Sequence, residues 1–384
     1  MSQVLQDKLF PQLGDCCDEP VTEKQRQLVS VLEVVKVERY VHGADMQWLG
    51  RKLKDRQAIA RAFVAKAVCG FPTTRALIEA LTSTRNLRDI CGFCAGNITV
   101  VREAAIGDGR SIKLTRRVGT FPSEATFSRA FTAFAAGDLG EIVHKALVKD
   151  YVGEELRGHI SHDSTAILGH EQPAKKDKKS VRAPKAVAKK RGRPKKGEIR
   201  TTEPTRLQRQ KEQSAEAGLR DIATQCDVGC KRDAKGYKVT WEGYKLHAST
   251  CDAGLPISVI VTSASVHDSQ VAIPMIKRCS ERTTYLYDLM DAAYDAAAIR
   301  EVSGELNHVP IIDRNARNGV AVPFSPAEKT RYNERTGVER FNSRIKEEFG
   351  ADNVRVRGHH KVKLHLMFGV LALFADQVLK LLRT

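Results

Sequence analysis

The spacing of apolar residues divides the chain into two parts. In residues 1–150 apolar side chains recur at intervals of three and four, which is typical of amphipathic helices. From about residue 237 they alternate with polar residues or form short runs, which is typical of strands. The pattern therefore predicts an all-helical N-terminal region followed by an α/β domain over 151–384. The N-terminal helices are expected near 25–41, 53–69, 74–84 and 124–136.

The second part is predicted to be a mixed sheet flanked by helices. Residues 236–250 and 255–265 are expected to pair as strands around a turn at Asp252-Ala-Gly. Shorter strands are expected at 283–290 and 308–312. Helices are expected from Asp268, with Asp268 or Ser269 as the cap, and over 291–304, 326–349 and 359–383.

One N-terminal segment has two interpretations. Residues 121–131, FPSEATFSRAF, resemble the second helix of a helix-turn-helix, with Thr126 and Arg129 on the polar side. The same spacing also describes an ordinary amphipathic helix. The sequence leaves both open.

A strongly basic segment lies between the helical part and the strand-rich part of the chain. Residues 171–213 contain 16 Lys and Arg against 5 Asp and Glu, four prolines and few large apolar residues. Such a segment cannot build a core, so 171–235 is expected to be a disordered, flexible basic insertion in the α/β domain. The chain as a whole carries +17, which favours a polyanionic partner such as nucleic acid.

Membrane and export signals are weak. The first ten residues lack a basic stretch followed by an apolar one, so no secretory signal is expected. The longest apolar run, Leu366 to Ala375, is too short to span a bilayer and is expected to be a buried helix. Nine cysteines without an export signal indicate reduced thiols. We expect a cytoplasmic protein associated with the nucleoid, with no membrane partner.

The segment 332–350 concentrates candidate chemistry on one helix. At about 100° per residue, four polar side chains fall within an arc of roughly 60°: Tyr332, Arg335, Glu339 and Lys346. Apolar residues cluster on another side, at Val338, Phe341, Ile345 and Phe349. The polar stripe suits a metal-binding carboxylate flanked by phosphate-binding cations. It equally suits a solvated face with an Arg335–Glu339 ion pair.

The spacing Tyr332-x2-Arg335-x3-Glu339-x6-Lys346 resembles the Tyr-Arg-Glu-Lys signature of bacterial insertion-sequence DDE transposases. Residues 243–272 resemble the family's second and third strands, and 162–167 and 291–296 resemble its first and second aspartate motifs. Residues 60–135 resemble its helical N-terminal region. Two positions depart from the family's frequent glycines, Ser164 and Ala293.

The resemblance implies an RNase H-like catalytic domain with Asp163, Asp291 and Glu339 as catalytic metal ligands. Two Mg²⁺ ions, for which Mn²⁺ substitutes, would be bridged by Asp163 and completed by the other two carboxylates. Water would free a 3′-hydroxyl at the element end, and that hydroxyl would attack target DNA. Tyr332, Arg335 and Lys346 would hold DNA phosphates. Pairing two ends of double-stranded DNA implies a homodimer or a higher oligomer.

Near the second aspartate, Asp288 competes with Asp291, because both lie close to the end of a predicted strand. The motif match favours Asp291. His267-Asp268 is a further candidate, as a general-base pair, but the helix cap is the preferred interpretation.

The basic insertion contains Arg191-Gly192-Arg193-Pro194, which resembles the core of an AT-hook. Such a segment lies extended in the minor groove of A·T-rich DNA. The alternative is a polybasic linker that binds any phosphate backbone. Residues 1–150 are expected to form a separate DNA-binding region.

Two other functions remain open at this point. One is a transposase-derived regulatory protein that binds DNA without catalysis, and the other is a nuclease that hydrolyses DNA without joining it. The presence of all three carboxylates disfavours the first. Short inverted repeats flanking the gene would favour transposition over both.

Overall fold

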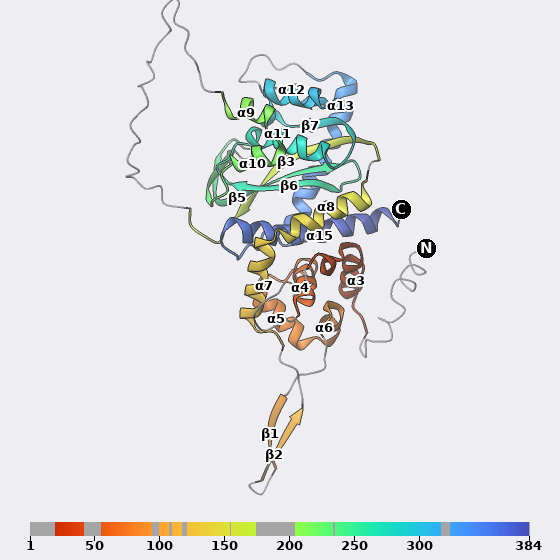
Figure 1. Cartoon of the computed structure of the whole chain (residues 1–384), viewed down its shortest axis with the longest axis vertical. Coiled ribbons are helices and arrows are strands. Elements are labelled where there is room, and N and C mark those ends of the chain that lie inside the picture. The colour runs from red at the N-terminus through yellow and green to blue at the C-terminus, as the bar shows by residue number, and fades with distance from the viewer. Residues whose placement is uncertain are drawn as a thin grey trace, which may run out of the picture.

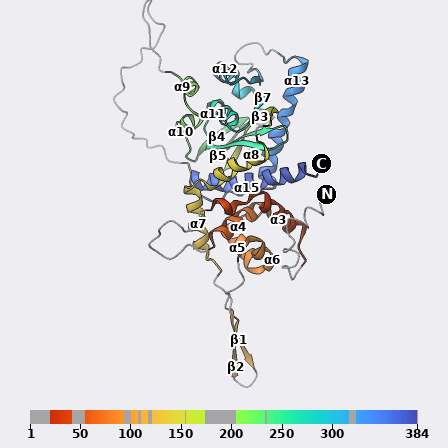
Figure 2. The ribbon, with the colours of Figure 1, turned by 45° about the vertical axis from the view of Figure 1, so that its right-hand side comes forward.

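The computed structural model describes residues 20–41, 55–93, 100–106, 110–116, 121–153, 155–173, 204–232, 235–315 and 323–383. A long helix, α15 (His359–Leu381), crosses the molecule between a sheet with its helices and a second group of helices (Figure 1). The view turned by 45° shows the same order of layers (Figure 2).

The strands beyond residue 150 form one six-stranded mixed sheet in the order β4-β5-β3-β7-β8, with β6 also paired to β5. β3 is antiparallel to β5 and parallel to β7, and β7 is parallel to β8. The strands are β3 (Arg157–Leu168), β4 (Asp227–Arg232), β5 (Lys238–Cys251), β6 (Pro256–Ser263), β7 (Tyr285–Met290) and β8 (Val309–Ile312).

The predicted strand pattern is confirmed in this sheet. β5 and β6 pair around the turn that contains Asp252, and the shorter strands β7 and β8 lie where apolar runs predicted them. β6 is buried along its whole length, which explains why its sequence is a nearly continuous apolar run. A β-bulge between Ser249 and Thr250 interrupts the β5–β6 register.

Helices cover both faces of the sheet. α11 and α12 contact one face and are in turn contacted by α9 and α10, whereas α14 and α15 contact the other face. Their bounds are α9 (Arg206–Glu212), α10 (Ala215–Arg220), α11 (Ser269–Ser280), η2 (Ala292–Tyr294), α12 (Ala297–Glu305), α13 (Pro326–Tyr332), η4 (Asn333–Arg335) and α14 (Thr336–Glu347).

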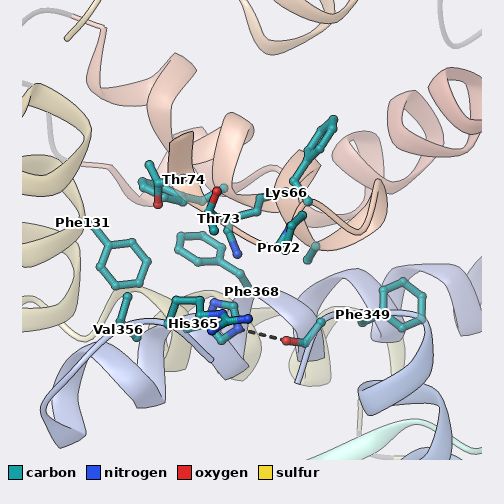
Figure 3. Close-up of a pocket in the computed structure, with 14 residues that line it drawn as sticks. Lys66, Pro72, Thr73, Thr74, Phe131, Phe349, Val356, His365 and Phe368 are labelled. Atoms are coloured by element: carbon teal, nitrogen blue, oxygen red, sulfur yellow. Dashed lines mark hydrogen bonds between the residues drawn. The ribbon is translucent and has the colours of Figure 1, made fainter. Parts of the chain in front are cut away.

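Most N-terminal helices pack on the opposite side of α15. They are α3 (Glu23–Val35), η1 (Val37–Tyr40), α4 (Arg56–Val68), α5 (Thr74–Ser83), α6 (Arg85–Cys91) and α7 (Glu124–Ala136). α8 (Leu139–Tyr151) lies on the sheet side of α15, where His144 contacts the Pro256 carbonyl at 2.8 Å. Phe63 of α4 and Phe131 of α7 meet Phe368 of α15, with ring centroids 5.6 and 6.3 Å from it (Figure 3). One hydrophobic cluster therefore includes residues from both sides of position 150.

Within the described residues, α15 is the one helix long and apolar enough to cross a membrane, and 78% of that stretch is buried inside the protein. Its residues Leu366 to Ala375 are all buried. The expectation of a buried helix there is confirmed.

Two predictions about organisation need correction. The N-terminal region is not all-helical, because β1 (Val100–Ile106) and β2 (Arg110–Arg116) form an antiparallel hairpin. The basic insertion was predicted to run from 171 to 235, but α9, α10 and β4 are formed from 206 onward. Apolar residues of this stretch, among them Ala215 and Ile222, are buried, so it belongs to the core domain.

Two predicted helices are also interrupted. The helix expected over 326–349 breaks at η4, where the Glu334 carbonyl accepts a hydrogen bond from the Ser161 hydroxyl of β3 at 3.4 Å. The helix expected from 291 begins at Ala297, after the short turn η2. Both breaks lie beside the sheet edge that carries the candidate site.

Candidate active site

β3 positions the first carboxylate. Alternate residues of a strand point to opposite faces, and here Ser161 and Asp163 face η4 and α14, whereas His162 and Ser164 face the other side. Asn342 of α14 donates a hydrogen bond from Nδ2 to Oδ2 of Asp163 at 3.0 Å. The pKa of Asp163 is raised to about 6, mainly by burial; the charge of Arg335 opposes this rise, and the charge of Asp291 adds to it.

Asp291 follows β7 directly, at the end of a strand parallel to β3. Its carboxylate accepts the Ala293 amide at 2.9 Å and so caps the short turn η2. Burial raises the pKa of Asp291, and the nearby charge of Asp268 raises it as well. The turn with Ala293 in place of the family's glycine therefore still holds the carboxylate at the strand end.

Glu339 is in the first turn of α14 and is half exposed. The helix is fixed by its other side, where Val338, Phe341 and Ile345 are buried against the sheet. This division between a packing face and a polar face matches the prediction from spacing.

Arg335 lies between the carboxylates. One of its guanidinium nitrogens is 3.8 Å from Oδ1 of Asp163, and another pairs with Glu339. The guanidinium also lies 5.8 Å from the ring centroid of Tyr332. Each interpretation of the stripe therefore has some support. The Arg335–Glu339 ion pair of a solvated face is formed, but Arg335 also lies near Asp163, as a phosphate-binding cation beside a metal ligand would.

The members of the predicted stripe do not all meet. The Tyr332 ring contacts the Phe324 ring at a tilt, with centroids 4.8 Å apart. Burial raises the pKa of Tyr332, and the nearby charges of Asp313 and Asp291 raise it as well. Lys346 is seven residues beyond Glu339, about 10 Å along the axis. Burial and the neighbouring charge of Lys231 on β4 lower the pKa of Lys346. Lys346 therefore belongs to a different part of the surface.

Asp288, the competitor of Asp291, is fully buried. It accepts hydrogen bonds from His162 at 2.9 Å, Tyr285 at 2.8 Å and Ser303 at 2.6 Å. Burial alone would raise its pKa, but the hydrogen bonds from His162 and His308 lower it well below the usual range. Its oxygens are committed to interior partners, which favours Asp291 over Asp288 as the candidate ligand.

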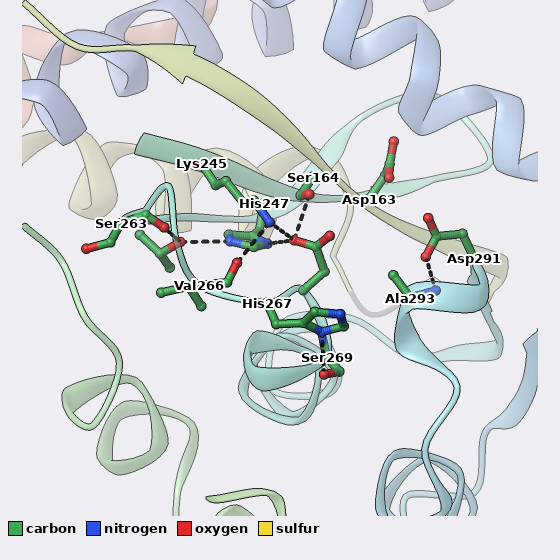
Figure 4. A network of polar contacts seen from close by, with 12 residues as sticks. Asp163, Ser164, Lys245, His247, Ser263, Val266, His267, Ser269, Asp291 and Ala293 are labelled. Carbon is green, nitrogen blue, oxygen red and sulfur yellow. Dashed lines mark hydrogen bonds and ion pairs between the residues drawn. The ribbon is translucent and has the colours of Figure 1, made fainter. Parts of the chain in front are cut away.

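Sequence reasoning missed one contributor, Asn342, and preferred a helix cap as the role of another, Asp268. Asp268 accepts hydrogen bonds from Ser164 and from Lys245 of β5, both at 2.9 Å, and lies 3.8 Å from His247 (Figure 4). Burial opposes its ionisation, but His247 and Lys245 lower its pKa. The Lys245-x-His247 alternation was a signal that two polar side chains share one face of β5.

Of the two predicted caps, Asp268 or Ser269, Asp268 occupies the N-cap position, because helix α11 begins at Ser269. Its side chain nevertheless makes no capping hydrogen bond, since Lys245 and Ser164 hold it. His267 instead contacts the Ser269 hydroxyl at 2.8 Å, so the pair His267-Asp268 does not act as a unit.

The donor chemistry of the site fits a hard divalent cation in part. Asp163 and Asp291 offer only oxygen ligands, which Mg²⁺ prefers, and their negative charges disfavour each other's ionisation until a cation is added. In the described residues no three Asp, Glu, His or Cys side chains are close enough to hold one ion, and Glu339 is paired with Arg335. The AT-hook-like residues Arg191 to Pro194 lie outside the described residues.

A six-stranded mixed sheet flanked by helices, with one acidic residue within β3 and another directly after the neighbouring parallel strand β7, fits an RNase H-like DDE domain. Residues 154–375, more than half of the chain, match the family described as transposase DDE domain, and the protein belongs to that family. No curated protein and no solved structure matches the chain. The family implies DNA binding and phosphoryl-transfer nuclease activity.

Proposed function

We propose that this protein is a DNA transposase that cleaves phosphodiester bonds at element ends and transfers the freed 3′-hydroxyl to target DNA. One observation supports this most directly. Asp163, Asp291 and the Arg335–Glu339 pair come from a strand, a strand end and a helix far apart in sequence, yet they gather beside one edge of the sheet.

Asp163, Asp291 and Glu339 are the residues that would hold Mg²⁺, or Mn²⁺ in its place, with two ions per site. Bound ions would neutralise charge on the reacting phosphate and activate the attacking oxygen. Glu339 is half exposed and, among the described residues, is paired with Arg335 alone, so it can turn toward the aspartates once Arg335 binds elsewhere.

The chain's own residues then position the DNA. A guanidinium binds phosphate oxygens through two parallel N–H groups, so Arg335 is suited to the phosphate at the scissile bond. Asn342 holds one oxygen of Asp163 and leaves the other directed toward Arg335. The Tyr332 ring, whose centroid lies 5.8 Å from the guanidinium, would help to hold it in place. Lys346, with Lys231 nearby, would bind phosphates farther along the strand.

The reaction is two in-line displacements at phosphorus. In the first, the oxygen of water bonds to phosphorus and the bond to the 3′-oxygen breaks, which leaves a 3′-hydroxyl on the element end. In the second, that hydroxyl attacks a phosphorus of target DNA and displaces the target's own 3′-oxygen. The protein forms no covalent bond to DNA in either step.

Remaining DNA contacts are assigned to the N-terminal region, residues 1–150, and to the basic insertion with its Arg191-Gly192-Arg193-Pro194 motif. Two copies of the protein would pair two DNA ends. The excess positive charge of the chain supports this assignment, because most of it falls in 171–213.

The test uses a duplex that ends in the inverted repeat flanking the gene, incubated with the protein and Mg²⁺. A transposase frees 3′-hydroxyl ends and joins them to a supercoiled plasmid. Cleavage without joined product would identify a hydrolytic nuclease. Sequence-specific binding with neither product would identify a regulatory protein.

A further inference from the structure

A pocket lies where the N-terminal helices meet the segment between α14 and α15, away from the carboxylates. It is lined by side chains of α4, α5 and α7 on one side and by Phe349, Arg355 and His365 on the other (Figure 3). Its space, counted with the open mouth, is about 470 Å³.

Lys66 extends from α4 into this pocket, in the direction of Phe368. The residue is 8% exposed, and within the described part of the chain its ammonium group has neither a hydrogen bond nor an ion pair. Burial lowers the pKa of Lys66 to about 8, so the amine still carries its charge at pH 7. A buried charge without a partner is costly, which points to a ligand that pairs with it.

The N-terminus of α5 faces the same space. Thr73 caps this ten-residue helix by accepting the Ala76 amide at 3.0 Å, and Thr73 and Thr74 both line the pocket. The amides of Thr74 and Arg75 belong to the first turn and have no acceptor within the helix. The helix dipole adds partial positive charge at this end.

No carboxylate is present among the residues that line the pocket, all of which are described. Arg355 is exposed at the pocket and makes no ion pair with a described residue. His365 donates from Nε2 to the Gly350 carbonyl at 3.0 Å, and burial, aided by the charge of Lys66, lowers its pKa to about 4. The imidazole is therefore neutral at pH 7, and the charge of the pocket is that of Lys66 and Arg355.

We propose that this pocket binds a phosphate group, with Lys66 and Arg355 as its ion partners and the first amides of α5 as hydrogen-bond donors. The group is a phosphate of bound DNA or a free phosphate ion. In either case it connects the N-terminal helices to residues 349–356, the segment that follows α14 and its Glu339.

The first experiment needs neither DNA nor cleavage, so it is independent of the proposed function. The melting temperature of the full chain is measured against inorganic phosphate, with chloride at equal ionic strength as reference. The variants are Lys66→Met, Arg355→Gln and, as a control on an exposed lysine of α8, Lys145→Met.

Phosphate stabilises most proteins by exclusion from their surface, so only the difference between variants counts. We expect saturable stabilisation of the wild type and of Lys145→Met. Lys66→Met should bind phosphate about tenfold more weakly or worse, with Arg355→Gln in between. Equal stabilisation of all four proteins would overturn the proposal. Arg355→Gln keeps the test decisive if Lys66→Met fails to fold.

The second experiment separates the two sources and rests on the proposed function. Duplex affinity is measured by fluorescence anisotropy in phosphate and in chloride at equal ionic strength. If a DNA phosphate occupies the pocket, phosphate competes with DNA for the wild type, and Lys66→Met lowers affinity about tenfold. If the ligand is the free ion, Lys66→Met and the wild type bind DNA equally while the first experiment still separates them.

Discussion

At the scale of single residues, the surroundings of Asp163 disfavour the charged form of its carboxylate. It is largely buried, one oxygen accepts from Asn342, and the Asp291 and Asp268 charges lie near. Its pKa of about 6 means that ionisation at neutral pH costs folding free energy. In a cation-binding site, the charge of a ligand carboxylate destabilises the protein until a cation binds to it.

Replacing Asp163 with Asn should therefore stabilise the protein at pH 7. The folded pKa is raised above the unfolded one, so wild-type stability falls as pH rises from about 4 to about 6, and the amide removes this loss. A gain on the order of 1–2 kcal/mol is expected. Thermal unfolding between pH 4.5 and 8 measures it, with the exposed Asp150→Asn as control. A variant that is less stable than the wild type at pH 7 would contradict this view of the site.

Local sequence patterns could predict some residues of the candidate site but not the contacts between them. Spacing and the family motif could place Asp163, Asp291 and Glu339, because each stands in a local pattern. Asp268 was assigned to a helix cap because a cap is also local. Its actual partner, Lys245, is on a strand 23 residues earlier. No local pattern shows that β5 and the start of α11 meet.

At the scale of elements, α14 has two faces with opposite roles. Phe341 and Ile345 are 2% and 0% exposed, whereas Arg335 and Glu339 face the carboxylate site. The sequence predicted this division correctly within α14. It missed the break at η4, because the competing hydrogen bond from Ser161 comes from another element.

The two faces predict opposite phenotypes. Arg335→Ala should slow end cleavage on the order of tenfold to a hundredfold with little loss of stability, since a charge-assisted phosphate contact contributes roughly 1.5–3 kcal/mol. Lys346→Ala should act in the same direction. Phe341→Ala and Ile345→Ala should lower the free energy of unfolding by about 2–5 kcal/mol. Melting temperature and cleavage rate are measured on all four variants.

The interpretation of α14 fails if Arg335→Ala melts as early as Phe341→Ala while cleavage per folded molecule is unchanged. In that case the Arg335 contacts to Asp163 and Glu339 would be structural. The support for Glu339 as a metal ligand would then be lost.

The strands β5 to β8 were predictable because each buries a continuous or alternating apolar pattern. The hairpin β1–β2 was not, although Gly107-Asp108-Gly109 between two strand-like runs is a turn signal. The hairpin was missed because the segments before and after it have the three- and four-residue apolar spacing of helices, so the whole region was predicted to be helical.

At the scale of the whole molecule, α15 joins the two groups of elements through one hydrophobic cluster. Helix α8 adds a polar connection, because Glu141 pairs with Arg282 and His144 contacts the Pro256 carbonyl at 2.8 Å. The N-terminal helices are thus fixed relative to the sheet, and DNA bound by one part would be held at a defined distance from the other.

Deleting residues 175–200 should leave this body folded, because this Lys- and Arg-rich segment has few large apolar residues with which to build a core. DNA affinity should fall, and the slope of log K against log salt should become shallower by several units. Melting temperature and salt-dependent anisotropy are the measurements. A slope equal to that of the wild type would mean that the deleted residues do not contact DNA.

The AT-hook interpretation has its own test. Arg191→Ala with Arg193→Ala should reduce any preference for A·T-rich duplexes while retaining most of the general affinity. An unchanged preference would leave a polybasic linker as the function of this segment.

The central claim is that Asp163, Asp291 and Glu339 bind the metal ions of a DNA-cleaving site. The most direct measurement is Mg²⁺-dependent end cleavage by Asp163→Asn, Asp291→Asn and Glu339→Gln, with DNA binding and melting temperature measured on the same proteins. Each variant should fold, bind DNA nearly as the wild type does, and cleave about a thousandfold more slowly or not at all. Near-normal cleavage by Asp291→Asn, together with its loss in a folded Asp288→Asn, would contradict the account.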